Sequence, residues 1–456
     1  MGQGSVGSGG FVARPDQVSL GVLVAAVLRF KVDEAAAVCG VAEQRRGGKL
    51  PPHVTAYLAM ALCLFSDDAA EEVAQKVTGS LSQFGVWDAA WEPPTSSGIT
   101  QARKRLGRDV LRETFYRVAE PVATGETRGA WLRGWRLMAI DGFDLDLPDS
   151  AENAAEFGYA GNDQSRSAFP KARVVAVVER GSHAFIDAEV GPWNRSEKMM
   201  AATLLSSISN DWLMLADRGF YSFAAFSAAA QTGAALCWRA PTQLSLPVLK
   251  VLSDGTYLSA LVDPRLRGHQ REELLQEVRR GTKPDPAAAH VVRVIEYDVP
   301  DRDGGELVCL ITTVTEPESA TAAELASAYH QRWEEEAANG QLKTVLRGPG
   351  KVLRSKIPDL VHQEIWAYLL VHYAINSLIC QAATGADIDP DRISFLRTLN
   401  IVRRTATGTA AFPPEPGKRS KPMSSPCSPH AETATPHAAT AATHASSNAP
   451  ATTPTG

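Results

Sequence analysis

The sequence predicts an α/β protein with an all-α N-terminal region and a low-complexity C-terminal end. Three observations lead to this fold class. Helical apolar periodicity runs from Ser19 to about Thr124. After it, two short apolar runs each end in an aspartate followed by a glycine-containing turn, which is typical of buried strands. From about Pro413 the chain is rich in Pro, Ala, Thr and Ser and cannot build a packed core.

Length and composition indicate an ordinary globular protein. The 456 residues are enough for two or three domains, with 44% hydrophobic and 21% charged residues. The net charge of -5 argues mildly against a nucleic-acid partner, although a local groove can still be positive. The 6 cysteines are scattered without a CxxC pair, so neither a zinc site nor a disulfide framework is indicated and reduced thiols in a cytosol fit best. The N-terminus lacks the features of a signal peptide, and we expect no membrane span.

The sequence predicts a helical N-terminal domain over residues 15–125, after a disordered segment over residues 1–14. The segment Val54–Phe65 is apolar nearly all round, so it should form a buried helix. After a Pro- and Gly-containing break, Arg103 and Lys104 lie in the first turns of another helix. Such a basic helix start suits DNA phosphates or a groove. The alternative is a solvated amphipathic helix.

The two runs that end in aspartate predict the centre of the next domain. In WRLMAIDG, Asp141 comes at the C-terminal end of a short strand, although Asp-Gly is also common in turns. In DWLMLADRGF, Asp217 stands at the corresponding position of a second strand. A hairpin over residues 173–190 and a helix over residues 196–208 lie between them. This order matches a ribonuclease-H-like core, in which the first and fourth strands lie side by side and the two aspartates converge. Three further acids after the first strand are interpreted as bystanders: Asp144, Asp146 and Asp149.

The stretch YHQRWEEEAANGQLK, residues 329–343, carries the strongest chemical signal. Helix-forming residues precede it, so we expect one long helix. On a continuous α-helix, Tyr329, Arg332, Glu336 and Lys343 fall within about 60° of one another. A carboxylate on such a stripe suits a metal ion, and the flanking cations suit phosphates. The alternative is a solvated helix face, and the spacing alone does not choose among the three consecutive glutamates.

The same spacing resembles the Y-R-E-K signature of DDE transposases of the IS-four type, which bacterial insertion sequences encode. The resemblance covers roughly residues 17–407. It selects Glu336 among the glutamates and implies that Asp141, Asp217 and Glu336 are the catalytic metal ligands. It also implies two Mg²⁺ ions, for which Mn²⁺ can substitute, and a ribonuclease-H-like catalytic domain over residues 130–385 with a mainly β insertion at about residues 232–316.

The activity implied by the resemblance is cut-and-paste DNA transposition. Water frees a 3′-hydroxyl at the transposon end, and this hydroxyl then attacks target DNA. Arg332 and Lys343 would bind phosphates of the transposon end, and Tyr329 would hydrogen-bond a phosphate, unless it is a tyrosine that packs its helix. In the insertion, Trp238 is a candidate DNA contact or, alternatively, a buried core residue. The resemblance further implies a homodimer in the DNA complex, terminal inverted repeats and target DNA as partners, and a bacterial, nucleoid-associated cytoplasmic location.

The C-terminal end departs from the family. After a helical segment over residues 386–412, the tail over residues 413–456 is expected to be disordered, whereas family members usually continue with a basic segment. This departure leaves open an alternative function, that of a decayed or domesticated relative that binds DNA without cleaving it. The intact acids and the Y-R-E-K residues favour the enzyme.

Overall fold

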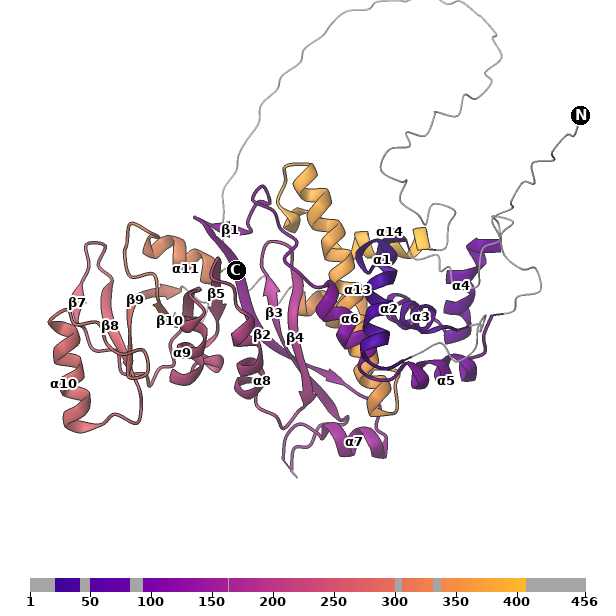
Figure 1. Cartoon of the computed structure of the whole chain (residues 1–456), viewed down its shortest axis with the longest axis horizontal. Coiled ribbons are helices and arrows are strands. Elements are labelled where there is room, and N and C mark those ends of the chain that lie inside the picture. The colour runs from indigo at the N-terminus through magenta and orange to yellow at the C-terminus, as the bar shows by residue number, and fades with distance from the viewer. Residues whose placement is uncertain are drawn as a thin grey trace, which may run out of the picture. The chain divides into compact units, whose positions relative to one another are not determined.

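A computed structural model of the chain describes residues 21–41, 50–82, 93–162, 164–299, 306–330 and 338–406. The predictions of disorder for residues 1–14 and for the tail after residue 413 lie outside the described residues. The described part is a mixed α/β structure in which N-terminal helices precede one large sheet (Figure 1).

Six helices form the described N-terminal region: α1 (Gly21–Ala26), α2 (Arg29–Val38), α3 (Pro52–Leu64), α4 (Ala70–Ser82), α5 (Ser96–Leu106) and α6 (Val110–Val118). The prediction of a buried helix near Val54–Phe65 is confirmed by α3, whose residues from His53 to Leu64 are all buried. Helix α3 packs against the long C-terminal helix α13 (Pro358–Gly385), and their apolar residues belong to one hydrophobic core. The N-terminal helices therefore share their core with the rest of the described chain.

One sheet contains all ten described strands, in the order β4-β3-β2-β5-β6-β10-β9-β8-β7, with β1 paired to β2. Their bounds are β1 (Trp131–Leu132), β2 (Trp135–Asp146), β3 (Lys171–Glu179), β4 (Ala184–Pro192), β5 (Trp212–Ala216), β6 (Ala235–Arg239), β7 (Lys250–Val251), β8 (Tyr257–Val262), β9 (Ala289–Val299) and β10 (Glu306–Thr312). The antiparallel meander β2-β3-β4 includes the predicted hairpin, and β5 pairs with β2 in parallel. The predicted adjacency of these two aspartate-bearing strands is confirmed.

Two details of the sheet differ from the predictions. Strand β2 does not end at Asp141 but continues to Asp146, because β3 pairs with it along its whole length up to the pair Asp146↔Lys171. Strand β6, which was expected to lie in the insertion, pairs in parallel with β5 and extends the central sheet. A parallel pair needs a crossover, and α9 (Phe223–Gln231) supplies it.

The remaining strands of the expected insertion continue the same sheet. Strand β10 pairs antiparallel with β6, and β9, β8 and β7 follow outward from it. Helix α10 (Gly268–Arg279) packs on β8, so this part is not purely β. Helix α7 (Ala151–Phe157) lies between β2 and β3, and α8 (Glu197–Leu204) lies between β4 and β5. Helix α11 (Ala322–His330) follows β10, and α14 (Phe395–Ala406) follows α13.

Helix α13 is the only described helix long and apolar enough to cross a membrane, but 83% of its most apolar window is buried inside the protein. It contacts α3, α6 and β4. This burial is that of a core helix, because every apolar side of α13 already has a protein partner.

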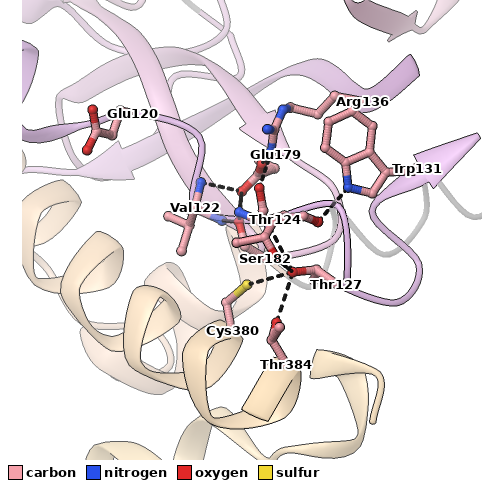
Figure 2. A network of polar contacts seen from close by, with 12 residues as sticks. Glu120, Val122, Thr124, Thr127, Trp131, Arg136, Glu179, Ser182, Cys380 and Thr384 are labelled. Carbon is pink, nitrogen blue, oxygen red and sulfur yellow. Dashed lines mark hydrogen bonds and ion pairs between the residues drawn. The ribbon is translucent and has the colours of Figure 1, made fainter. Parts of the chain in front are cut away.

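A buried carboxylate ties the segment between α6 and β2 to the sheet. Figure 2 shows Glu179, at the end of β3, accepting hydrogen bonds from the backbone nitrogen of Val122 (2.8 Å) and from the hydroxyl of Ser182. The backbone nitrogen of Ala123 also donates to this carboxylate, at 3.0 Å. Arg136 forms an ion pair with the same carboxylate, whose side chain is fully buried. A buried charge is tolerated because it is both paired and hydrogen-bonded.

Candidate active site

Strand alternation brings Asp141 and Asp217 to the same face of the sheet. The parallel pairing of β2 with β5 ends at the pair Ile140↔Ala216, so the two aspartates are the next residues on two adjacent strands. Successive side chains of a strand point to opposite faces. Leu137 and Leu213 therefore lie on the face of the two aspartates, and both pack in the hydrophobic cluster that contains residues of α11.

Helix α11 supplies a hydrogen bond to Asp217. The hydroxyl of Tyr329, at the end of α11, donates to Oδ1 of Asp217 at 3.1 Å. The Tyr329 side chain is only 3% exposed and its ring packs in the cluster beneath the strands. In this structure the Tyr329 hydroxyl contacts a carboxylate, and its buried ring agrees with the alternative of a tyrosine that packs its helix. The predicted contact with a phosphate stays a prediction.

Asn339 makes the corresponding contact with Asp141. Its Nδ2 donates to Oδ2 of Asp141 at 2.6 Å, and the residue is 8% exposed. Asn339 is not among the site residues predicted from the sequence. The available signal was its position three residues after Glu336, which on a helix lies on nearly the same face. Each described aspartate of the site thus receives a hydrogen bond from a buried side chain.

The stretch after Asn339 is not α-helical. Residues Gln341–Leu346 form a π-helix, with the backbone nitrogen of Arg347 bonded to the carbonyl of Leu342 at 3.0 Å. The expectation of one continuous α-helix through Lys343 is therefore wrong at this end, because a π-helix winds with i→i+5 bonds. Lys343 is half-buried in this segment.

Two predicted site residues lie outside the described residues. Glu336, the expected third carboxylate, and Arg332, an expected phosphate contact, both fall within residues 331–337. Their roles stay predictions.

A further carboxylate approaches the site from the other face of the sheet. A Cβ added at Gly142, the residue after Asp141, would lie 3.0 Å from a carboxylate oxygen of Glu197, the first residue of α8. Burial raises the pKa of Glu197; Arg173 opposes this shift, and the charges of Asp144 and Asp141 add to it. Nothing in the sequence pattern singled out Glu197, because its proximity to β2 depends on the packing of α8.

The acids interpreted as bystanders have partners on the neighbouring strand. Asp144 lies 3.0 Å from Nε of Arg173, and Asp146 lies 2.5 Å from Nζ of Lys171. Both cations belong to β3, so these ion pairs run across the β2–β3 ladder.

The predicted DNA contacts on α5 differ in burial: Arg103 is buried, whereas Lys104 is exposed. Arg103 is 9% exposed, and its guanidinium donates to Gln363 (3.0 Å), to Ser355 (3.2 Å) and to the carbonyl of Leu360 (3.1 Å). This burial does not favour the predicted DNA contact, because the side chain ties α5 to α13 and its vicinity. The DNA contact of Arg103 stays a prediction. The next residue, Lys104, is exposed.

Trp238 lies on β6 and is fully buried, with its ring 5.4 Å from that of Phe226. The alternative of a core residue is confirmed, and the predicted DNA contact by Trp238 is corrected because the side chain has no exposed surface.

Two family models match parts of this chain. Residues 17–116 match the family described as insertion element 4 transposase N-terminal, and residues 134–373 match the transposase DDE domain. The second match covers more than half of the chain. The chain belongs to the DDE transposase family. Asp141, Asp217 and Asn339 all lie within the matched DDE domain.

The relatives of this DDE transposase chain include two proteins of Escherichia coli (strain K12). It is 27% identical over 312 residues to the transposase InsG for insertion sequence element IS4, which covers 68% of this chain and 66% of the relative. It is 28% identical over 206 residues to the putative transposase InsZ, which covers 45% of this chain and 68% of the relative. The chain thus spans about two thirds of the length of the curated relatives it matches.

Among solved structures, the chain is similar to the piggyBac transposase in a synaptic complex with hairpin DNA, determined by cryo-EM. The sequence identity is 10% and the TM-score is 0.40, with 85% of this chain and 78% of the other covered.

A DDE domain implies divalent metal ions, and the described residues can be tested for their fit to them. Asp141 and Asp217 offer carboxylate oxygens, the ligands that Mg²⁺ prefers, from two adjacent strands. Within the described residues, no three His, Cys, Asp or Glu side chains gather into a group that could hold a metal ion. The donor chemistry of the two aspartates fits, and a third carboxylate such as Glu336 would be needed to complete the set.

Proposed function

We propose that this chain is a transposase that cleaves DNA at transposon ends and joins the freed 3′-hydroxyl ends to target DNA. The observation that supports this most is the alignment of Asp141 and Asp217, which directly follow the last parallel pair of β2 and β5. Both side chains receive hydrogen bonds from buried donors. Paired carboxylates held in this way are suited to phosphoryl transfer at a phosphodiester.

In the proposed reaction, Asp141, Asp217 and Glu336 would hold two Mg²⁺ ions, for which Mn²⁺ could substitute. When bound, such ions lower the pKa of an attacking water and neutralise charge that develops on the leaving oxygen. Tyr329 and Asn339 orient the two described aspartates, so that their oxygens are in position before DNA arrives. No covalent bond between the chain and DNA is needed.

The DNA contacts of the proposal come from cations near the site. Arg332 and Lys343 would bind phosphates of the transposon end, and exposed Lys104 is a further candidate. We propose terminal inverted repeats and target DNA as the partners, a homodimer as the active form in the DNA complex, and the bacterial cytoplasm, in association with the nucleoid, as the location. The non-catalytic alternative is not favoured, because Asp141 and Asp217 and their hydrogen-bond donors are all in place.

The proposal is tested by cleavage. The purified chain is incubated with Mg²⁺ and a plasmid that carries the genomic DNA flanking its coding sequence on both sides. We expect metal-dependent nicking at the transposon ends, which Asp141→Asn, Asp217→Asn and Glu336→Gln each abolish while binding to the ends survives.

Asp211→Asn is the matched control, because Asp211 is an exposed aspartate that directly precedes β5, at the end of this strand opposite Asp217. It should cleave like the wild type. Cleavage at a near wild-type rate by any of the three site variants would show that the corresponding residue has been assigned wrongly.

A further inference from the structure

The contact between Asn339 and Asp141 is short and sheltered. Nδ2 of Asn339 lies 2.6 Å from Oδ2 of Asp141, and 92% of the Asn339 surface is removed from solvent, since the residue is 8% exposed. An amide nitrogen donates hydrogen bonds and carries no charge, so it orients a carboxylate without neutralising it. Asn339 thus restrains the rotamer of Asp141 without neutralising its charge.

Side chains of α13 contact the helical turn that contains Asn339. His372 and Asn376 each place a side-chain nitrogen near Oε1 of Gln341, at 3.1 Å and 3.2 Å respectively. His372 also hydrogen-bonds the backbone of Ala338. On a helix, positions 338 and 341 lie on nearly the same face, while position 339 is turned about 100° away from position 338. One face of this turn is therefore fastened to α13, and Asn339 is directed toward β2.

The fastening is buried and uncharged. His372 and Asn376 are both fully buried, and burial lowers the pKa of His372 to about 3, so its imidazole is neutral at neutral pH. The His372 ring also packs against Phe185 of β4, with the ring centres 4.6 Å apart. Oδ1 of Asn376 has no hydrogen-bond partner among the described residues, but movement of the turn would break the buried contacts of Gln341 and leave further polar atoms unpaired.

The π-helix begins directly after this turn, at Gln341. Gln341, the first residue of the π-helix, is therefore the residue whose side chain contacts His372 and Asn376 of α13. Short π-helical segments are rare and occur often at functional sites. Here the change of helix type lies two residues after Asn339, the residue that contacts Asp141.

We propose that Asn339 is a positioning residue for the metal site, and that the buried contacts of Gln341 with His372 and Asn376 hold it in place. This inference rests on the proposed function, since it assigns Asn339 a role toward the ions that Asp141 would bind. Side chains that orient a metal ligand typically change metal affinity or activity by about 10–100-fold when they are removed.

The test measures Mn²⁺ binding directly, by electron paramagnetic resonance of the free full-length protein, and does not depend on cleavage. We expect Asn339→Ala to weaken the site by about tenfold. Asn400→Ala is the matched control, because Asn400 is an exposed asparagine of α14, and it should bind Mn²⁺ like the wild type. Asn339→Leu keeps the branched shape of the side chain without the amide and should match the alanine variant.

A double variant separates positioning from general destabilisation. Gln341→Met removes the bonds to α13 at a distance from Asp141, and we expect a smaller weakening of Mn²⁺ binding. If Gln341 acts through Asn339, Gln341→Met should have no further effect in the Asn339→Ala protein. Thermal unfolding of each variant checks that it is folded, and a purely structural role would lower the Tm of the variants without changing their Mn²⁺ affinity.

The Mn²⁺ measurements distinguish failure of the positioning role from failure of the proposed metal site. If the wild type binds Mn²⁺ in a manner that Asp141→Asn abolishes, but Asn339→Ala and Asn339→Leu bind it equally well, the positioning role is overturned while the proposed function stands. If the wild type shows no Mn²⁺ binding that depends on Asp141, even in the presence of DNA carrying the transposon ends, the proposed metal site itself is wrong.

Discussion

Replacing Tyr329 by phenylalanine removes one oxygen atom and leaves the buried ring in place. The lost interaction is the hydrogen bond of 3.1 Å to Oδ1 of Asp217. The ring still fills its site, and water can replace the lost donor because Asp217 is only half-buried. The free energy of unfolding should therefore fall by only about 1 kcal/mol. Truncation to alanine would cost roughly 3–5 kcal/mol, since it also empties the core.

The effect of Tyr329→Phe on cleavage should be larger than its effect on stability. Loss of the donor allows the Asp217 carboxylate to rotate, and loss of such an orienting group typically costs about 10–100-fold in activity. The assay is single-turnover nicking of DNA that carries the transposon ends, at saturating protein, together with equilibrium binding of the same DNA. We expect a slower rate within the bound complex and unchanged affinity.

Tyr297→Phe is the matched control for this prediction. Tyr297 is a partly buried tyrosine of β9 whose hydroxyl has no hydrogen-bond partner among the described residues, so its removal should alter neither rate nor affinity. If Tyr329→Phe instead weakened DNA binding and left the rate within the complex unchanged, the hydroxyl would be a phosphate contact. The assignment to Asp217 would then be refuted.

The remaining predictions concern stability. Glu179→Gln should lower the free energy of unfolding by about 3 kcal/mol, measured by urea denaturation, because it leaves Arg136 without its carboxylate partner; a change below about 1 kcal/mol would contradict this. Arg103→Met should destabilise the fold by a similar amount without changing the salt dependence of DNA binding. Lys104→Met should reduce that salt dependence and leave stability unchanged. The reverse pattern would place Arg103 at the DNA. His372, whose pKa falls from 6.5 to about 3 on folding, should make stability decrease as the pH falls below about 6.5, by about 2 kcal/mol at pH 5, and His372→Gln should flatten this slope.

The central part of the fold could be predicted because it depends on short-range patterns. The apolar runs before Asp141 and Asp217 have the length and composition of buried strands, and the order of elements between them brings those strands together. The burial of α3 followed from a segment that is apolar on every side. These features are set by residues that are close in the sequence.

The errors arise where packing between distant segments decides the outcome. Arg103 looks like an exposed cation in a basic helix, yet three acceptors from residues 355–363 surround its guanidinium. No local pattern reveals partners more than 250 residues away. The extent of β2 past Asp141 depends in the same way on its pairing with β3.

The helix that ends in Lys343 illustrates the third kind of error. Its residues have good helical propensity, which does not distinguish an α-helix from a π-helix. The wider turn is compatible with the contacts that Gln341 makes to α13, and these contacts are tertiary. Asn339 was overlooked for the same reason, because its importance follows from the Asp141 carboxylate opposite it and not from its own sequence neighbours.

The most direct test of the account compares the wild-type chain with Asp217→Asn and Asp211→Asn in Mg²⁺-dependent nicking of DNA that carries the flanking ends. We expect nicking at the ends by the wild type and by Asp211→Asn, and none by Asp217→Asn, although all three bind the ends. Nicking by Asp217→Asn at the wild-type rate would contradict the claim that the carboxylates following β2 and β5 form the catalytic site.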